Sequence, residues 1–80
     1  MNREEVHDRL ESVFQDVFGR DSLKIYDETT AKDIKDWDSF QQINLLVGIE
    51  DEFGLEVPLK KVNKRANIGE MIDYIFEELS

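Results

Sequence analysis

Residues 33–54 read DIKDWDSFQQINLLVGIEDEFG and contain the most apolar helical segment of the chain. At about 100° per residue, the apolar side chains of this helix cover most of the helical circle, with Gln42 and Glu50 as interruptions. The apolar residues are Phe40, Ile43, Leu45, Leu46, Val47, Ile49 and Phe53, and the opposite polar strip holds Gln41, Asn44, Gly48, Asp51 and Glu52. A helix with so wide an apolar arc must pack against more than one neighbour. We therefore expect it to begin at Asp38 or Ser39, end by Gly54 and form the centre of a bundle.

Amphipathic stripes predict two further long helices. The first runs from about Arg3 to Phe18, and Gly19 supplies its stop. The last follows Asn67 and Glu70, which have the spacing of a capping box. The stripes consist of Val6, Leu10, Val13, Phe14, Val17 and Phe18 in the first helix, and of Ile68, Met71, Ile72, Ile75, Phe76 and Leu79 in the last.

Two connecting segments complete the predicted fold. Residues 20–37 form a long first loop with a helical turn within residues 30–34. After Pro58, the pair Leu59 and Val62 is expected to seed a short helix that carries a basic cluster of Lys60, Lys61, Lys64 and Arg65. No segment alternates with period two. The expected fold is all-α: a single domain over residues 1–80, a four-helix bundle with three long helices, a short third helix and a long first loop.

The charge is strongly acidic. Ten basic and nineteen acidic residues give a net charge of −9, which repels nucleic acid and anionic lipid. The acids gather in residues 27–56, where nine acidic and two basic residues leave a net −7. Two interpretations remain open for this region, an ordinary solvated surface or a surface that recognises basic partners.

Several classes of protein and site are excluded or disfavoured. No apolar run approaches the length of a membrane span, and the first residues lack the apolar core of a secretory signal. The absence of cysteine excludes disulfides and a thiol nucleophile and fits a reducing cytosol. A calcium loop fails because Asp38 stands where glycine is needed, counting from Asp33. His7 is the single histidine, so zinc and a catalytic triad are improbable, and we expect it to be a solvated surface residue. We predict neither catalytic residues nor a metal site.

The pair Asp38 and Ser39 admits two roles. Asp38 followed by Gln41 has the spacing of an N-cap with a reaching partner three residues on, so capping alone explains the aspartate. Ser39 then occupies the first helical position, where the helix does not need its hydroxyl. A serine at this position lies beside unsatisfied N–H groups and the positive end of the helix dipole, which tolerate an attached phosphodiester.

The triplet Asp38-Ser39-Phe40, the apolar spacing through Phe53, the exit EDEFGLEVP and the closing IDYI resemble the acyl carrier protein family. The resemblance covers essentially the whole chain. It implies that a phosphopantetheinyl transferase attaches 4′-phosphopantetheine from coenzyme A to Ser39, with Asp38 recognised near the magnesium ion of the transferase.

The resemblance also implies a function and partners. The chain would be a cytoplasmic, non-catalytic and monomeric carrier that delivers acyl, aminoacyl or polyketide intermediates as thioesters. Its partners would be acyl- or aminoacyl-activating and transferring enzymes of lipid, fatty acid or secondary-metabolite biosynthesis. The expected partner-binding residues are Asp36, Phe40, Gln41, Asn44, Glu50 and Asp51. Two roles are open for the apolar residues of the central helix, the last helix and the first loop. They part to shelter an acyl chain, or they only pack the core. The alternative function is an unmodified acidic interaction module.

Three departures from the family pattern, together with Trp37, favour a specialised stand-alone carrier over a housekeeping fatty-acid carrier. Phe40 stands where many fatty-acid carriers have leucine, and Gln41 and Asn44 replace acids on the recognition helix. The third-helix region is basic rather than acidic. Trp37 before the Asp-Ser pair is typical of carriers dedicated to particular biosynthetic enzymes.

The wide apolar arc yields one prediction about stability. Phe40 is assigned to the core, so Phe40→Asp buries a charge at the start of the central helix and is expected to loosen the fold. Thermal unfolding measures this effect, and a melting temperature equal to that of the wild type contradicts the core assignment.

Overall fold

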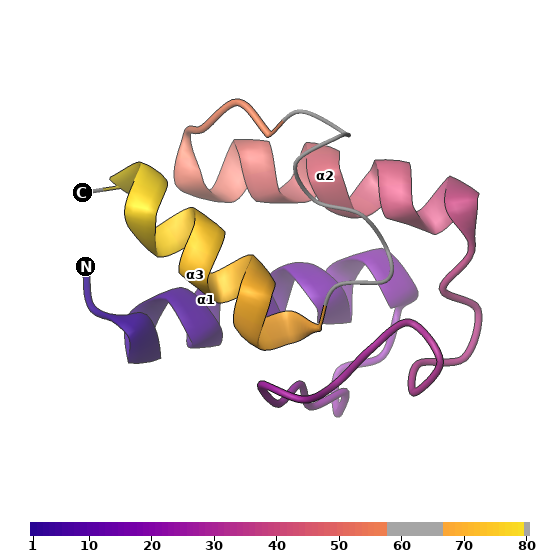
Figure 1. The fold of residues 1–80 in the computed structure, drawn as a ribbon. Coiled ribbons are helices and arrows are strands. Elements are labelled where there is room, and N and C mark those ends of the chain that lie inside the picture. Colours follow the sequence, from indigo (N-terminus) through magenta and orange to yellow (C-terminus); the bar gives the residue numbers. More distant parts are fainter. Residues whose placement is uncertain (58–66, 80) are drawn as a thin grey trace.

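The computed structural model describes residues 1–57 and 67–79, which form an all-helical structure without strands in those ranges. Its helices are α1 (Arg3–Phe18), α2 (Ser39–Phe53) and α3 (Ile68–Leu79). Helix α1 packs against both α2 and α3, and the start of α1 lies at the same side of the molecule as the end of α3 (Figure 1). The three long helices are confirmed. The predicted short third helix and the basic cluster of Lys60, Lys61, Lys64 and Arg65 lie outside the described residues.

The helix ends follow from local capping. Asn2 and Glu5 form a reciprocal capping box at the start of α1, in which the Asn2 side chain accepts from the Glu5 N–H at 2.8 Å. Helices α1 and α2 are both terminated by a glycine in the left-handed region, Gly19 and Gly54, each with φ 65°. Asn67 Oδ1 accepts from the Glu70 N–H at 2.9 Å at the start of α3, as its sequence spacing predicts.

The described core combines all three helices with anchors from the loops. Its buried apolar residues are Val6, Leu10, Val13, Phe14, Ile25, Ile34, Trp37, Leu45, Leu46, Ile49, Phe53, Val57, Ile68, Met71, Ile72 and Ile75. Gly48 allows the close approach of α1 and α2, because a Cβ atom there would lie 2.8 Å from Val13 Cγ1. The sequence pattern places Gly48 on a polar strip, whereas in the structure it packs against α1.

The core assignment of Phe40 is wrong. Phe40 is 75% exposed, and Ile43 and Val47 on the same side of α2 are 54% and 52% exposed. The face of α2 toward the core instead begins with Gln42, which is 5% exposed. A charge at position 40 would remain in water, so the physical reason to expect that Phe40→Asp loosens the fold disappears.

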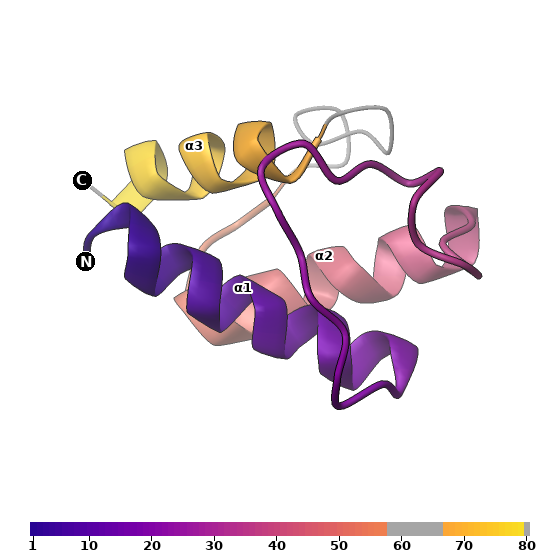
Figure 2. The ribbon, with the colours of Figure 1, turned by 90° about the horizontal axis from the view of Figure 1, so that it is seen from below.

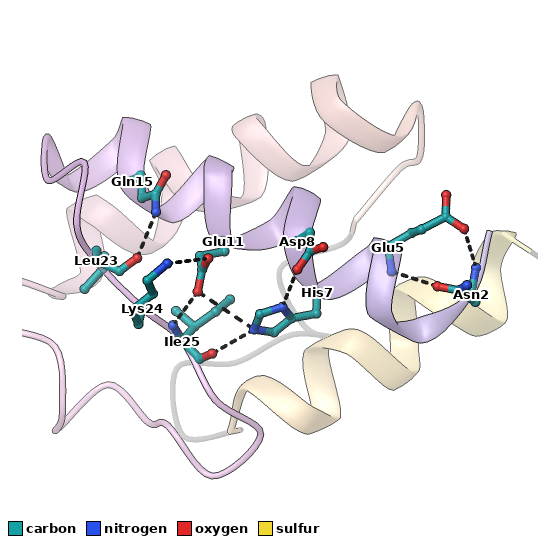
Figure 3. Close-up of polar contacts among 9 residues, drawn as sticks. All are labelled: Asn2, Glu5, His7, Asp8, Glu11, Gln15, Leu23, Lys24 and Ile25. Atoms are coloured by element: carbon teal, nitrogen blue, oxygen red, sulfur yellow. Dashed lines mark hydrogen bonds and ion pairs between the residues drawn. The ribbon is translucent and has the colours of Figure 1, made fainter.

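Side chains of α1 hold the first loop against the helix (Figure 3). His7 Nε2 lies 2.8 Å from the Ile25 carbonyl oxygen, and Glu11 Oε2 accepts from the Ile25 N–H at 3.1 Å. Gln15 Nε2 donates to the Leu23 carbonyl at 3.0 Å. His7, Glu11 and Gln15 are spaced four residues apart and share one helix face. His7 is therefore half-buried and bonded, and our expectation of a solvated surface histidine is wrong.

After it leaves α1, the loop passes the start of α3 and then turns toward the start of α2 (Figure 2). The Ile68 and Gly69 N–H groups donate to the Thr29 and Asp27 carbonyls at 2.9 and 2.8 Å. These bonds satisfy backbone donors at the amino end of α3 that have no partner within the helix. The turn expected within residues 30–34 is present, with the Asp33 N–H donating to the Thr30 carbonyl at 2.9 Å. The loop is thus fixed to two helices before it reaches α2.

The His7 contacts generate a prediction about pH. Burial lowers the pKa of His7, but the hydrogen bond to Ile25, the bond to Asp8 and the charge of Glu11 together raise it above the usual 6.5. Only the protonated ring can donate to both the Ile25 carbonyl and the Asp8 carboxylate. Because the folded pKa is raised, this stabilisation is fully present below the unfolded pKa and is lost as pH rises through the folded pKa.

We expect the melting temperature of the wild type to exceed that of His7→Gln most at about pH 5.5 and least at about pH 8.5. Glutamine is neutral throughout, so the difference reports the charge of the imidazole, which lies beside the charged side chains Asp8 and Glu11, with Lys24 paired to Glu11. A difference that stays constant across this range would contradict the assignment.

Candidate functional site

Ser39 is exposed at the first position of α2, directly after its N-cap. The cap is Asp38, as predicted: its Oδ1 accepts from the Gln41 N–H, and its carbonyl accepts from the Gln42 N–H, each at 2.9 Å. Gln41 Oε1 accepts from Asn44 Nδ2 at 2.9 Å, so the structure shows only the aspartate half of the expected reciprocal cap. The cap fixes the backbone on both sides of Ser39 and leaves that residue at the surface.

A buried polar pair lies beneath this surface. Trp37 Nε1 donates to Gln42 Oε1 at 2.7 Å, and the two residues are only 7% and 5% exposed. The indole packs edge-on against Phe14 at 5.2 Å between ring centroids, and also against Phe18 at 6.3 Å. Trp37 precedes the N-cap and Gln42 is the fourth helical residue, which are the two positions that a hydrophobic staple joins. Here a hydrogen bond joins them, and that spacing is the signal by which Gln42 could have been found in the sequence.

Asp36 gives the chain its turn into the site. It adopts φ 72°, in the left-handed region that aspartate tolerates better than most residues. Its carbonyl accepts from the Asp38 N–H at 3.0 Å, and its Oδ2 lies 3.2 Å from Arg20 Nη2. Arg20 also donates to the Lys35 carbonyl at 3.1 Å. The predicted partner-binding residue Asp36 therefore has a partner within the chain, in a solvent-exposed ion pair.

The remaining predicted partner-binding residues divide between the two ends of α2. Phe40, Gln41 and Asn44 lie with Ser39 near its amino end, whereas Glu50 and Asp51 lie about 17 Å from Ser39 along the helix axis. Asp51 is exposed. Glu50 Oε2 accepts from the Val57 N–H at 2.9 Å and so holds the chain that leaves α2. The structure does not bring these residues together into one cluster around Ser39.

Phe40 also belongs to an exposed apolar stripe on α2, which we define as Phe40, Ile43 and Val47. The sequence pattern placed all three in the core, so their exposure could not be anticipated from the helical wheel. An exposed stripe at spacings of three and four residues is a surface that can bind an apolar partner.

The amino end of α2 suits a covalently attached phosphate group. An exposed serine oxygen at a helix N-terminus places such a group beside backbone N–H donors and the positive end of the helix dipole. Within residues 1–57 and 67–79, no group of three or more histidine or acidic side chains could hold a metal ion. In the same ranges no helix is long and apolar enough to cross a membrane.

The chain is similar to known carrier proteins along nearly its whole length. A family described as "Phosphopantetheine attachment site" matches residues 8–75. The acyl carrier protein of Rubrobacter xylanophilus is 27% identical over 77 residues, 96% of this chain and 95% of that protein. The acyl carrier protein of Lactobacillus acidophilus is 29% identical over 75 residues, 94% of each chain.

A solved structure extends the similarity to the fold. The solution NMR structure of a holo acyl carrier protein from Geobacter metallireducens superposes with a TM-score of 0.83 at 34% identity. The match covers 92% of this chain and 85% of that one. Together the similarities confirm the resemblance to acyl carrier proteins, and they imply a covalently attached 4′-phosphopantetheine, as expected.

The capping geometry predicts a specific pair of stabilities. Asp38→Ala removes the acceptor of the Gln41 N–H and is expected to lower the free energy of unfolding by about 1 kcal/mol. Asp38→Asn keeps an oxygen at that position and is expected to stay within a few tenths of a kcal/mol of the wild type. Urea unfolding followed by circular dichroism measures both. Equal losses in the two variants would show that the charge, and not the cap, stabilises α2.

Proposed function

This chain belongs to the phosphopantetheine attachment-site family, and from that premise we propose that Ser39 is its attachment residue. Covalent 4′-phosphopantetheine is its cofactor, and the chain is a carrier rather than a catalyst. The observation that carries the choice of Ser39 is its exposure at the first residue of α2, beside the N-cap Asp38. Attached there, the group supplies the thiol that this cysteine-free chain lacks, so acyl groups can travel as thioesters.

The residues around Ser39 have supporting roles in this proposal. Asp38 holds the helix end in place through the Gln41 N–H, and its exposed carboxylate is the feature that a phosphopantetheinyl transferase recognises. Because Asp38→Asn keeps the cap, slower labelling of that variant would measure the recognition separately from stability. The first-turn position also keeps the hydroxyl outside the core, within reach of an enzyme.

Docking of partner enzymes would use Asp36, Phe40, Gln41, Asn44, Glu50 and Asp51 together with the exposed apolar stripe. The acids would attract basic surfaces and speed encounter, while the limited area would let the carrier leave after each transfer. The expected partners are acyl- or aminoacyl-activating and transferring enzymes of lipid or secondary-metabolite biosynthesis.

Phe40, Gln41 and Asn44 also support a narrower role. Phe40 stands where many housekeeping fatty-acid carriers have leucine, and Gln41 and Asn44 stand where those carriers tend to have acidic residues. We therefore propose a specialised stand-alone carrier. It would act as a monomer with one carrier domain over residues 1–80. The cytoplasmic location stays a prediction.

Intact-mass measurement tests the attachment residue. The protein is incubated with coenzyme A, magnesium and a promiscuous phosphopantetheinyl transferase. We expect one phosphopantetheine adduct on the wild type and none on Ser39→Ala. Ser22→Ala, which removes another exposed serine, is the matched control and should be labelled like the wild type.

The opposite result favours the interaction module. A folded wild type that stays unmodified while a known carrier is labelled in parallel would contradict the proposal. An adduct that persists in Ser39→Ala would contradict the choice of residue.

A further inference from the structure

The first core-facing residue of α2 after the attachment serine is polar. Ser39 and Gln42 are three residues apart and share one side of the first turn. Phe40, which follows Ser39, and Ile43, which follows Gln42, are exposed instead. A chain attached at Ser39 that entered the core along α2 would therefore meet Gln42 before it reached the apolar residues Leu45 and Ile49.

Gln42 is hydrogen-bonded to Trp37 at this position. The Trp37–Gln42 hydrogen bond is short, at 2.7 Å, and both residues are buried. The indole is held from behind by the rings of Phe14 and Phe18, so it has aromatic neighbours on the core side. In the described part of the chain, every buried side-chain nitrogen and oxygen has a hydrogen-bond partner. The position on α2 just inside Ser39 is thus both polar and fully hydrogen-bonded.

We propose, on the premise that Ser39 carries the arm as above, that the Trp37–Gln42 pair keeps apolar acyl chains out of the core. The cargo class that follows is short or polar acyl groups held in solvent. An alkyl chain that separated the pair would leave an amide oxygen and an indole N–H facing methylene groups, and unpaired buried polar groups are strongly unfavourable. A short or polar acyl group gains little from burial, because the hydrophobic gain grows with the number of buried methylene groups.

The same pair also stabilises the amino end of α2, and a loss of stability on mutation would not separate the two roles. Chain-length dependence does separate them. If the contact is purely structural, its removal shifts the melting temperature of all acylated forms equally. If the contact excludes alkyl chains, its removal makes the melting temperature rise with the length of the acyl chain.

The experiment loads the protein with acetyl-, octanoyl- and dodecanoyl-phosphopantetheine, using the corresponding coenzyme A thioesters, and verifies loading by mass. The readouts are the melting temperature and the fluorescence of Trp37, which is the single tryptophan. For the wild type we expect melting temperatures equal within about 1 °C and unchanged emission across the three forms. For Gln42→Leu, which opens an apolar path, we expect the dodecanoyl form to melt about 4 °C or more above the acetyl form.

Gln15→Leu is the control for the replacement itself, since Gln15 lies on α1, outside the buried pair and outside the proposed docking residues. Its three acylated forms should share one melting temperature, as in the wild type, whatever the loss of the Leu23 contact does to the absolute value. If Gln42→Leu fails to fold, Trp37→Phe replaces it in the melting comparison, because it keeps a ring and removes the indole N–H.

Two results would overturn the inference alone: a wild type stabilised by longer chains, or a folded Gln42→Leu protein indifferent to chain length. Failure of the wild type to load at all would instead remove the proposed function, and this inference with it.

Discussion

The contacts of the Trp37 indole are the constraint on which the site depends. The ring packs against Phe14 of α1, and its N–H donates to Gln42 of α2, so one side chain joins two helices at the end of the long loop. Only Asp38 separates this buried ring from the exposed Ser39. The chain therefore passes from core to surface within two residues. Because Trp37 fixes one side of that passage and the Asp38 cap fixes the other, Ser39 has a defined place at the mouth of α2.

The acidic residues of this region serve the fold as well as the surface. Asp36 pairs with Arg20, Asp38 caps α2 and Glu50 binds the Val57 N–H. An exposed ion pair such as Asp36–Arg20 contributes about 0–1 kcal/mol, so a partner could replace Arg20 at little expense. The half-buried bond of Glu50 to a backbone donor is harder to exchange. The two carboxylates thus differ in how readily they can turn toward another protein.

Local rules predicted the helices because local interactions set their ends. Asp38 and Gly54 mark the start and stop of α2 by cap chemistry alone, and both bounds follow from the sequence. Burial on α2 could not be predicted in the same way. An apolar arc wider than half the circle does not say which side of α2 packs against the other helices. The sequence pattern therefore places Phe40 in the core and treats Gln42 as a polar interruption of the apolar arc. The contacts that reverse this assignment come from Trp37 and from α1, and they depend on the tertiary arrangement. The His7 bond to Ile25 is likewise invisible to periodicity, since it joins a helix to an irregular loop.

Peptide mapping after labelling with coenzyme A and a phosphopantetheinyl transferase tests the central claim most directly. The tryptic peptide of residues 36–60 contains Ser39 as its single hydroxyl-bearing residue. Presentation of Ser39 by the capped end of α2 predicts that the phosphopantetheine is found in this peptide and that fragmentation assigns it to Ser39. An adduct confined to a peptide that contains Ser12, Ser22 or Ser80 would contradict the account.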